Sequence, residues 1–272
     1  PLLQQQTFPG WELWLCTEER SEGTRALCRD AETVDLRFRS MGITDKVSDP
    51  YSLSTAIENS SGGYVAFLGQ HDQLAPEALE IVERYLDKDK WDVVYTDEDR
   101  IDPDGIHRDP FFKPDWSPDL SMSRPYACCL AVYRRNLLDL VGTLQNSCHC
   151  DVEYDLALRC SEQTDRIGHI SRVLYHRGTA LTAWHKQESM KEALRAALTR
   201  RSEEAVVSDG PELGTYHVRR GIRGSPLVSI IIPSRDQVKL LRNCIDSVEK
   251  LTTYPHYEII IMDNGTEDPE SL

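Results

Sequence analysis

Residues 252–270 read TTYPHYEIIIMDNGTEDPE, and this stretch decides the fold. Its run YEIIIMD is nearly continuously apolar and ends in Asp, and Asn and Gly follow it. This pattern is typical of a buried parallel strand with polar side chains at its carboxyl end. A second apolar strand, VSIIIPSRD at residues 228–236, precedes it, and we expect a helix over 237–250 between the two. Strand, helix and strand in this order predict a parallel β-α-β unit.

The amino terminus repeats this stretch. Residues 7–13, TFPGWEL, match residues 253–259, TYPHYEI, position for position. Two copies so far apart indicate two tandem domains of one fold rather than a solenoid. We therefore expect a first domain over 1–205 that lacks its first strand, a linker rich in Gly, Pro and Arg over 206–226, and the start of a truncated second domain over 227–272.

The first copy alternates strands with helices. Strands are expected at 11–16, 64–68, 91–102 and 167–178, the third of them buried, and helices at 52–61, from 76 onward, at 153–163 and at 186–204. The segment at 126–138 continues from strand into helix. This alternation predicts an α/β fold with a mostly parallel central sheet and flanking helices.

Composition narrows the functional classes. The net charge of −14 over 272 residues argues against general binding to nucleic acid, and no run of about 18 apolar residues forms a membrane segment in this chain. Eight cysteines over this length do not make a disulfide scaffold, and the CHC set at 148–150 has no second pair at zinc-finger spacing. We expect reduced thiols and a cytoplasmic location, including the inner face of the membrane. The chain begins without Met and reads as a fragment, so targeting signals can lie outside it.

Six motifs then follow one another along the chain: YVAFLGQHDQLAPEAL, VVYTDEDRIDPDG, FKPDWSPDL, VYRRNLL, EYDLALR and RVLYHRG. In this order and spacing the sequence resembles the family 2 glycosyltransferases with the GT-A fold, most of all the tandem-domain bacterial members linked to surface polysaccharide synthesis. The resemblance implies transfer of a sugar from a nucleotide-diphosphate donor to an acceptor hydroxyl of a growing glycan, usually with inversion. The implied partners are the nucleotide sugar and the glycan acceptor.

The resemblance also implies a divalent metal, Mn²⁺ or Mg²⁺, which stabilises the leaving diphosphate. The family holds it with a DxD motif, and Gly69 and His71 stand at the two Asp positions here. His71, the adjacent Asp72, and His176 of the last motif are the candidate metal ligands. The alternative is a polar turn that has lost its metal, with His176 as a hydrogen-bonded structural residue.

Glu153 and Asp155 match the family's Asp-x-Asp around the catalytic base, so the resemblance implies Glu153 as general base and Asp155 as its helper. The alternative is a pair of acids in the first turn of a helix, stabilised by the helix dipole.

For the nucleotide, Thr17 and Glu18 stand where the family has Asp-Asp-Gly or Asp-Asn-Gly. Asp97 and Asp99 crowd the end of a strand and are candidates for lining the same site, although a loop salt-bridged by Arg100 is the alternative. Trp116 is a candidate for stacking on a sugar or, alternatively, for packing.

Two functional hypotheses remain. One is an active inverting glycosyltransferase domain. The other is a degenerate GT-A domain that binds or positions a substrate or partner without catalysis, as the altered positions Thr17, Glu18, Gly69 and His71 favour. A nucleotidyltransferase is less favoured, because no Gly-rich phosphate loop of that kind is visible.

Overall fold

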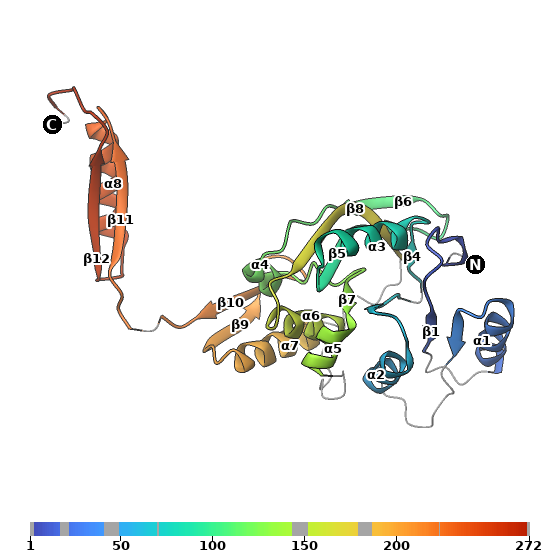
Figure 1. Ribbon diagram of the computed structural model, residues 1–272. Helices are drawn as coiled ribbons and strands as arrows, with labels where there is room; N and C mark the ends of the chain where they lie inside the picture. Colours follow the sequence, from blue (N-terminus) through green and yellow to red (C-terminus); the bar gives the residue numbers. More distant parts are fainter. Residues whose placement is uncertain are drawn as a thin grey trace. The chain divides into compact units, whose positions relative to one another are not determined.

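The computed structural model describes residues 3–16, 22–40, 49–69, 71–142, 152–178, 187–222 and 224–270. The chain forms two compact units, residues 1–220 and 221–272 (Figure 1). None of the helices described is long and apolar enough to cross a bilayer.

A six-stranded sheet forms the centre of the first unit. Its order is β3 (Tyr64–Ala66), β7 (Val132–Arg134), β5 (Val93–Ile101), β8 (Ile167–Gly178) and β4 (Gln73–Leu74), and β6 (His107–Phe111) pairs with β5. The long central pair, β5 and β8, is parallel, and β3 runs in the same direction because β7 is antiparallel to both β3 and β5. The strands that carry the expected motifs thus run together, while the short strands β4, β6 and β7 run against them.

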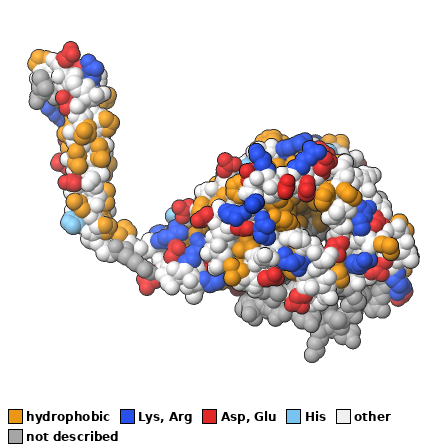
Figure 2. All heavy atoms as spheres, in the orientation of Figure 1, with side chains coloured by type: hydrophobic (Ala, Val, Ile, Leu, Met, Phe, Trp, Pro, Cys, Tyr) orange, Lys and Arg blue, Asp and Glu red, His pale blue; other side chains and the backbone are white. Residues whose placement is uncertain are grey.

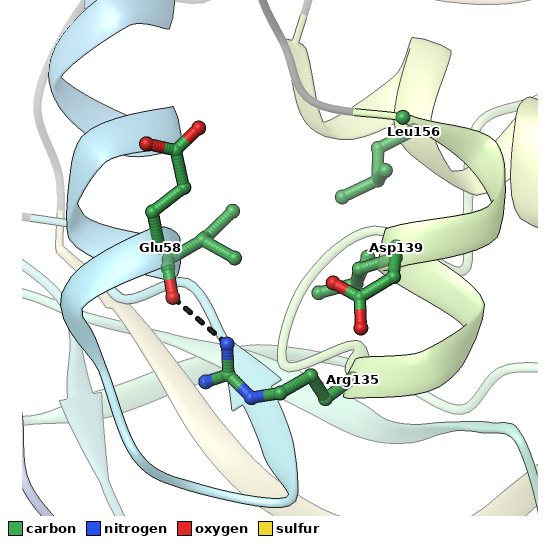
Figure 3. A pocket seen from close by; sticks show the side chains of 7 residues that line it. Glu58, Arg135, Asp139 and Leu156 are labelled. Carbon is green, nitrogen blue, oxygen red and sulfur yellow. Dashed lines mark hydrogen bonds between the residues drawn. The ribbon is translucent and has the colours of Figure 1, made fainter.

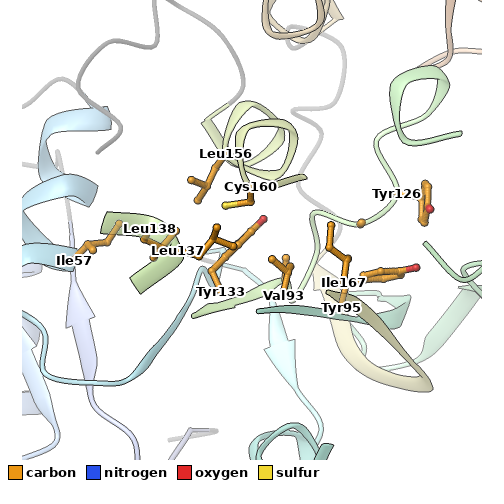
Figure 4. Close-up of a cluster of buried hydrophobic side chains, with 12 residues drawn as sticks. Ile57, Val93, Tyr95, Tyr126, Tyr133, Leu137, Leu138, Leu156, Cys160 and Ile167 are labelled. Carbon is orange, nitrogen blue, oxygen red and sulfur yellow. The ribbon is translucent and has the colours of Figure 1, made fainter. Parts of the chain in front are cut away.

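Both faces of this sheet are covered, which explains the continuous apolar run of β5. Val93 and Tyr95 lie on one face, in a cluster with side chains of α2 (Asp49–Asn59), α5 (Arg135–Val141) and α6 (Val152–Ser161). Figure 4 shows Tyr95 beside Ile167 and Tyr126 in this cluster. Val94 packs on the other face with Val82 and Leu86 of α3 (Ala78–Asp89). The alternation of side chains along one strand therefore supplies two separate cores.

A third apolar cluster joins α6 to α4 (Pro118–Ser123), α7 (Gln187–Arg200) and a hairpin. The hairpin consists of the antiparallel strands β9 (Ala205–Asp209) and β10 (Tyr216–Arg220), and Tyr216 is buried in the cluster. Most of the expected linker, 206–226, is therefore ordered structure of the first unit. At the amino terminus, η1 (Leu3–Gln5) is followed by the parallel pair β1 (Leu13–Leu15) and β2 (Phe38–Ser40), with α1 (Glu22–Val34) between them in the chain.

The second unit contains β11 (Val228–Ser234), α8 (Val238–Leu251) and β12 (Tyr257–Asp263). Its two strands are parallel and pair Ile230 with Ile259, so the β-α-β expectation is confirmed. Large apolar side chains such as Ile231, Leu240 and Leu251 are exposed on this unit, and orange atoms gather along it in Figure 2. That the unit begins a second domain of the same fold remains a proposal.

Candidate functional site

The carboxyl ends of β3, β5 and β8 bring the predicted polar residues to one edge of the sheet. Asp72 lies in the turn that follows β3, Asp99 lies near the end of β5, and His176 lies near the end of β8. The β5–β8 register places Asp99 opposite His176, and β4 places Gln73 on the other side of His176. An open α/β sheet holds its ligands at this edge.

Asp99 joins two histidines. Its Oδ1 lies 2.6 Å from His176 Nδ1 and its Oδ2 lies 2.9 Å from His107 Nδ1. The two imidazole rings meet edge to face, with centroids 4.4 Å apart. The three residues each offer a ligand atom within 4.8 Å of the others, a group that could hold a metal ion. His107 comes from β6, which the sequence reading did not identify.

The turn that replaces the family motif is organised differently. Tyr175 Oη donates to Asp72 Oδ2, and Gly178 N donates to Asp72 Oδ1 at 2.9 Å, so both carboxylate oxygens are engaged. Burial and the bond to Asp72 raise the pKa of Tyr175, which keeps its hydroxyl a donor. His71 is exposed. Among the described residues, the group that could hold a metal ion is Asp99, His107 and His176, and it includes neither His71 nor Asp72.

Gly69 leaves space for this orientation of the Asp72 side chain. A Cβ at Gly69 would lie 2.2 Å from Asp72 Oδ2, and a Cβ at Gly178 would lie 2.3 Å from the His71 carbonyl oxygen. Such contacts are shorter than any real Cβ tolerates. With Asp72 turned toward Tyr175, there is no room for an aspartate at position 69.

Asp97 is committed to a different network. Its Oδ1 accepts from Lys113 N at 2.8 Å and pairs with His169 Nε2 at 2.8 Å. The His169 ring stacks on Tyr95, with centroids 5.0 Å apart, and its Nδ1 lies 3.2 Å from Asp115. Through these bonds Asp97 anchors the segment around Lys113 to β5. None of these bonds connects Asp97 to Asp99, His107 or His176.

Glu98 forms a buried ion pair. Lys113 Nζ lies 2.8 Å from Glu98 Oε2, and Arg177 Nη1 lies 3.3 Å from Glu98 Oε1. Burial alone would raise the pKa of Glu98, but Lys113 and Arg177 outweigh it, so this pKa lies below its ordinary value. The three carboxylates 97–99 therefore have three separate sets of partners.

Glu153 and Asp155 both lie in the first turn of α6, yet their environments differ. Asp155 is buried and pairs with Arg159 Nε at 2.9 Å and with Arg200 Nη1 at 3.5 Å. Glu153 is half-buried. Burial of the thiol is the largest cause that raises the pKa of Cys129, followed by the charge of Glu98 and, more weakly, that of Glu153. Both glutamates therefore act on the same thiol.

Three further candidates were predicted for nucleotide binding or stacking. Thr17 and Glu18 lie outside the described residues. Trp116 is half-buried, packs against the core and lies 6.2 Å from the Tyr126 ring centroid, which agrees with the packing alternative.

A separate cavity of about 250 Å³ lies between α2, α5 and α6 (Figure 3). Arg135 on its wall donates to the Ile57 and Gly62 carbonyls and to Ser60 Oγ, which fixes the end of α2. None of the predicted site residues that the structure describes lines this cavity.

These features define a class of protein. The sheet with carboxylates and a histidine at its carboxyl edge is a GT-A glycosyltransferase fold, and solved structures of that kind resemble it. Residues 1–349 of S. aureus TarS in complex with UDP-GlcNAc match with a TM-score of 0.56 at 15% identity, over 72% of this chain and 60% of that one. The mannosyltransferase PcManGT from Pyrobaculum calidifontis, in complex with GDP-Man and Mn²⁺, matches with a TM-score of 0.52 at 12% identity, over 74% and 58%.

The chain belongs to glycosyl transferase family 2, whose model matches residues 2–139 and 229–271. It is 36% identical to the O-antigen biosynthesis protein RfbC of Myxococcus xanthus, over 99% of this chain and 22% of that protein. It is 33% identical to the protein y4gI of Sinorhizobium fredii, over 99% of this chain and 31% of that protein. The chain thus spans less than a third of the length of these relatives.

Proposed function

We propose that the first unit transfers a sugar from a nucleotide-diphosphate donor to a hydroxyl of a growing glycan, with inversion at the anomeric carbon. The observation that carries this proposal is the convergence of Asp72, Asp99 and His176 at the carboxyl ends of three strands that run in one direction. Two similar proteins support the substrate class, since TarS was solved in complex with UDP-GlcNAc and RfbC is an O-antigen biosynthesis protein.

The carboxyl edge of the six-stranded sheet offers ligands for a divalent metal. The carboxylate of Asp99 and the imidazole of His176 suit Mn²⁺. The turn after β3 fits a metal less well. Gly69 provides no carboxylate there, and both oxygens of Asp72 already accept hydrogen bonds. When bound, a divalent metal would neutralise the charge that develops on the leaving diphosphate.

Glu153 is the proposed general base. It begins α6 as a half-buried carboxylate, so it can reach both protein and solvent. It would accept the proton of the acceptor hydroxyl as the new bond forms at the anomeric carbon. Asp155 would act as a positioning residue, since it pairs with Arg159 within α6 and with Arg200 of α7.

A second candidate is a GT-A domain that binds or positions a substrate or partner without catalysis. The engagement of Asp72 by Tyr175 and Gly178, with no room for an aspartate at Gly69, favours it. In either case the expected location is the cytoplasm, including the inner face of the membrane. The cysteines of the described residues are free thiols, which supports this expectation.

Calorimetric titration and a transfer assay separate the two candidates. We expect UDP-, GDP- or dTDP-sugars to bind in a Mn²⁺-dependent manner and the nucleoside diphosphate to be released when acceptor is added. Glu153→Gln should retain donor binding and lose transfer, whereas Glu83→Gln, an exposed position on α3, should retain both. Donor binding without transfer by the unaltered protein would favour the non-catalytic candidate, and no binding to any donor would refute the proposed reaction.

A further inference from the structure

We infer that Asp99, His107 and His176 form a binding site for a first-row transition metal between Mn²⁺ and Zn²⁺, in preference to Mg²⁺ and Ca²⁺. His107 is the new member of this set, and neither position of the altered family turn, His71 or Asp72, belongs to it. The inference deepens the proposed function and rests on it for its biological role, but metal binding itself can be measured alone.

Asp99 differs from the other buried acidic residues in its partners. Four acidic side chains of the described residues are buried: Asp97, Glu98, Asp99 and Asp155. Glu98 is paired with Lys113 and Arg177, Asp155 with two arginines, and Asp97 accepts a backbone N–H in addition to His169. Among the described residues, the basic groups at Asp99 are two imidazoles.

A buried carboxylate is costly unless a positive charge compensates it. Both imidazoles contact the Asp99 oxygens through Nδ1. A divalent cation provides the charge, and it uses the same three side chains as ligands.

The geometry of Asp99, His107 and His176 also favours a metal site. The three residues come from β5, β6 and β8, so the sheet holds them in place without a flexible loop. Each oxygen of Asp99 faces one imidazole nitrogen, at 2.6 and 2.9 Å. His107 is half exposed, whereas Asp99 and His176 are 10% and 14% exposed, so an ion can enter from the side of His107.

The donor atoms determine the preferred metal. Mg²⁺ and Ca²⁺ prefer sets of oxygen ligands, whereas imidazole nitrogen favours the later divalent ions of the first row. Two imidazoles and one carboxylate also leave coordination positions open, as in metal sites that bind a further ligand. A diphosphate oxygen is the ligand that the proposed function would place there.

The test uses the untagged chain and metal ions alone. Calorimetry and the loss of the free Mn²⁺ spin-resonance signal should show one site that binds Mn²⁺ and Zn²⁺ and is not competed by an equal concentration of Mg²⁺. His107→Ala should weaken binding at least about tenfold, because a ligand contributes at least as much as an outer-shell group. His217→Ala, an exposed histidine on β10, should leave binding unchanged.

His107 is half exposed, so its replacement should leave the fold intact, which unfolding curves would verify. Binding that is unaffected by His107→Ala, binding that is lost only in Asp72→Ala, or a preference for Mg²⁺ would each overturn the inference. Metal binding without any donor binding would support the site and refute the proposed transfer, so the two failures are distinguishable.

Discussion

Replacing Lys113 by Met tests the buried ion pair next to the candidate site. The Lys113 side chain is fully buried, and its Nζ lies 2.8 Å from Glu98 Oε2 and 3.3 Å from the Cys129 carbonyl oxygen. Met has a similar length but no charge, so the substitution leaves the Glu98 carboxylate with Arg177 alone. Breaking one side of a buried pair costs roughly 3–5 kcal/mol. Because Arg177 remains, we expect a loss of about 3 kcal/mol in the free energy of unfolding at neutral pH.

The pH dependence carries a definite sign. The pKa of Glu98 in the folded protein lies below its ordinary value of 4.5. The stability that this carboxylate contributes is therefore fully present above about pH 4.5 and is lost as the pH falls through the lowered pKa. Without Lys113, burial raises that pKa, so the cost of the substitution should be largest at neutral pH and should shrink in acid.

Urea unfolding at pH 7 and at pH 4 measures both effects. The double variant Glu98→Gln, Lys113→Met should recover much of the lost stability, because it removes the unpaired charge. Lys88→Met, an exposed position on α3, serves as the control and should change little. A cost below about 1 kcal/mol, or a cost that grows in acid, would refute the assignment of a buried ion pair.

Three further predictions concern the turn and α6. Gly69→Ala should destabilise the protein by about 1–3 kcal/mol, because the new Cβ contacts the Asp72 side chain. The cost should be smaller in a Tyr175→Phe background, where Asp72 no longer accepts the Tyr175 hydrogen bond. If urea unfolding shows that the two costs simply add, positions 69 and 175 are not coupled through Asp72. Asp155→Asn should lower the free energy of unfolding by about 3 kcal/mol, because it removes the partner of two arginines; an unchanged unfolding curve would contradict this. Glu153→Gln should lower the transfer rate by about 10² or more without a comparable loss of stability, and a rate close to that of the unaltered protein would exclude it as the base.

Local pattern predicted the central strands well. The continuous apolar run before Asp97 indicates a strand buried on both faces, and Val93 and Val94 do pack in opposite cores. The resemblance assigned His176 to the metal site and made Asp99 a candidate for lining the nucleotide site, and the β5–β8 register places the two residues opposite each other. The strands depended on short-range periodicity, whereas these two candidates depended on the resemblance.

Long-range pairing explains what the sequence did not reveal. The strand β6, HRDPF, is short, charged and interrupted by Pro, so it has no strand periodicity of its own and forms by pairing with β5. His107 was missed for that reason. The hairpin at Ala205–Asp209 and Tyr216–Arg220 was missed because the Gly and Pro of its turn were interpreted as a linker.

The roles of adjacent carboxylates were also hidden. Asp97, Glu98 and Asp99 are neighbours in sequence, but their partners come from other strands and loops. Only the fold shows that Glu98 pairs with Lys113 while Asp99 meets two histidines. Asp155 matched a motif position as a helper of the base, and its burial against Arg159 assigns it a structural contact that the motif alone did not specify.

A crystal structure of this chain with a nucleotide sugar and Mn²⁺ tests the central claim most directly. We expect Mn²⁺, located by anomalous scattering, between Asp99, His107 and His176, with the donor diphosphate against it at the carboxyl ends of β5 and β8. A nucleotide bound at another surface, or a diphosphate at this edge with Mn²⁺ held by His71 and Asp72 instead, would contradict it.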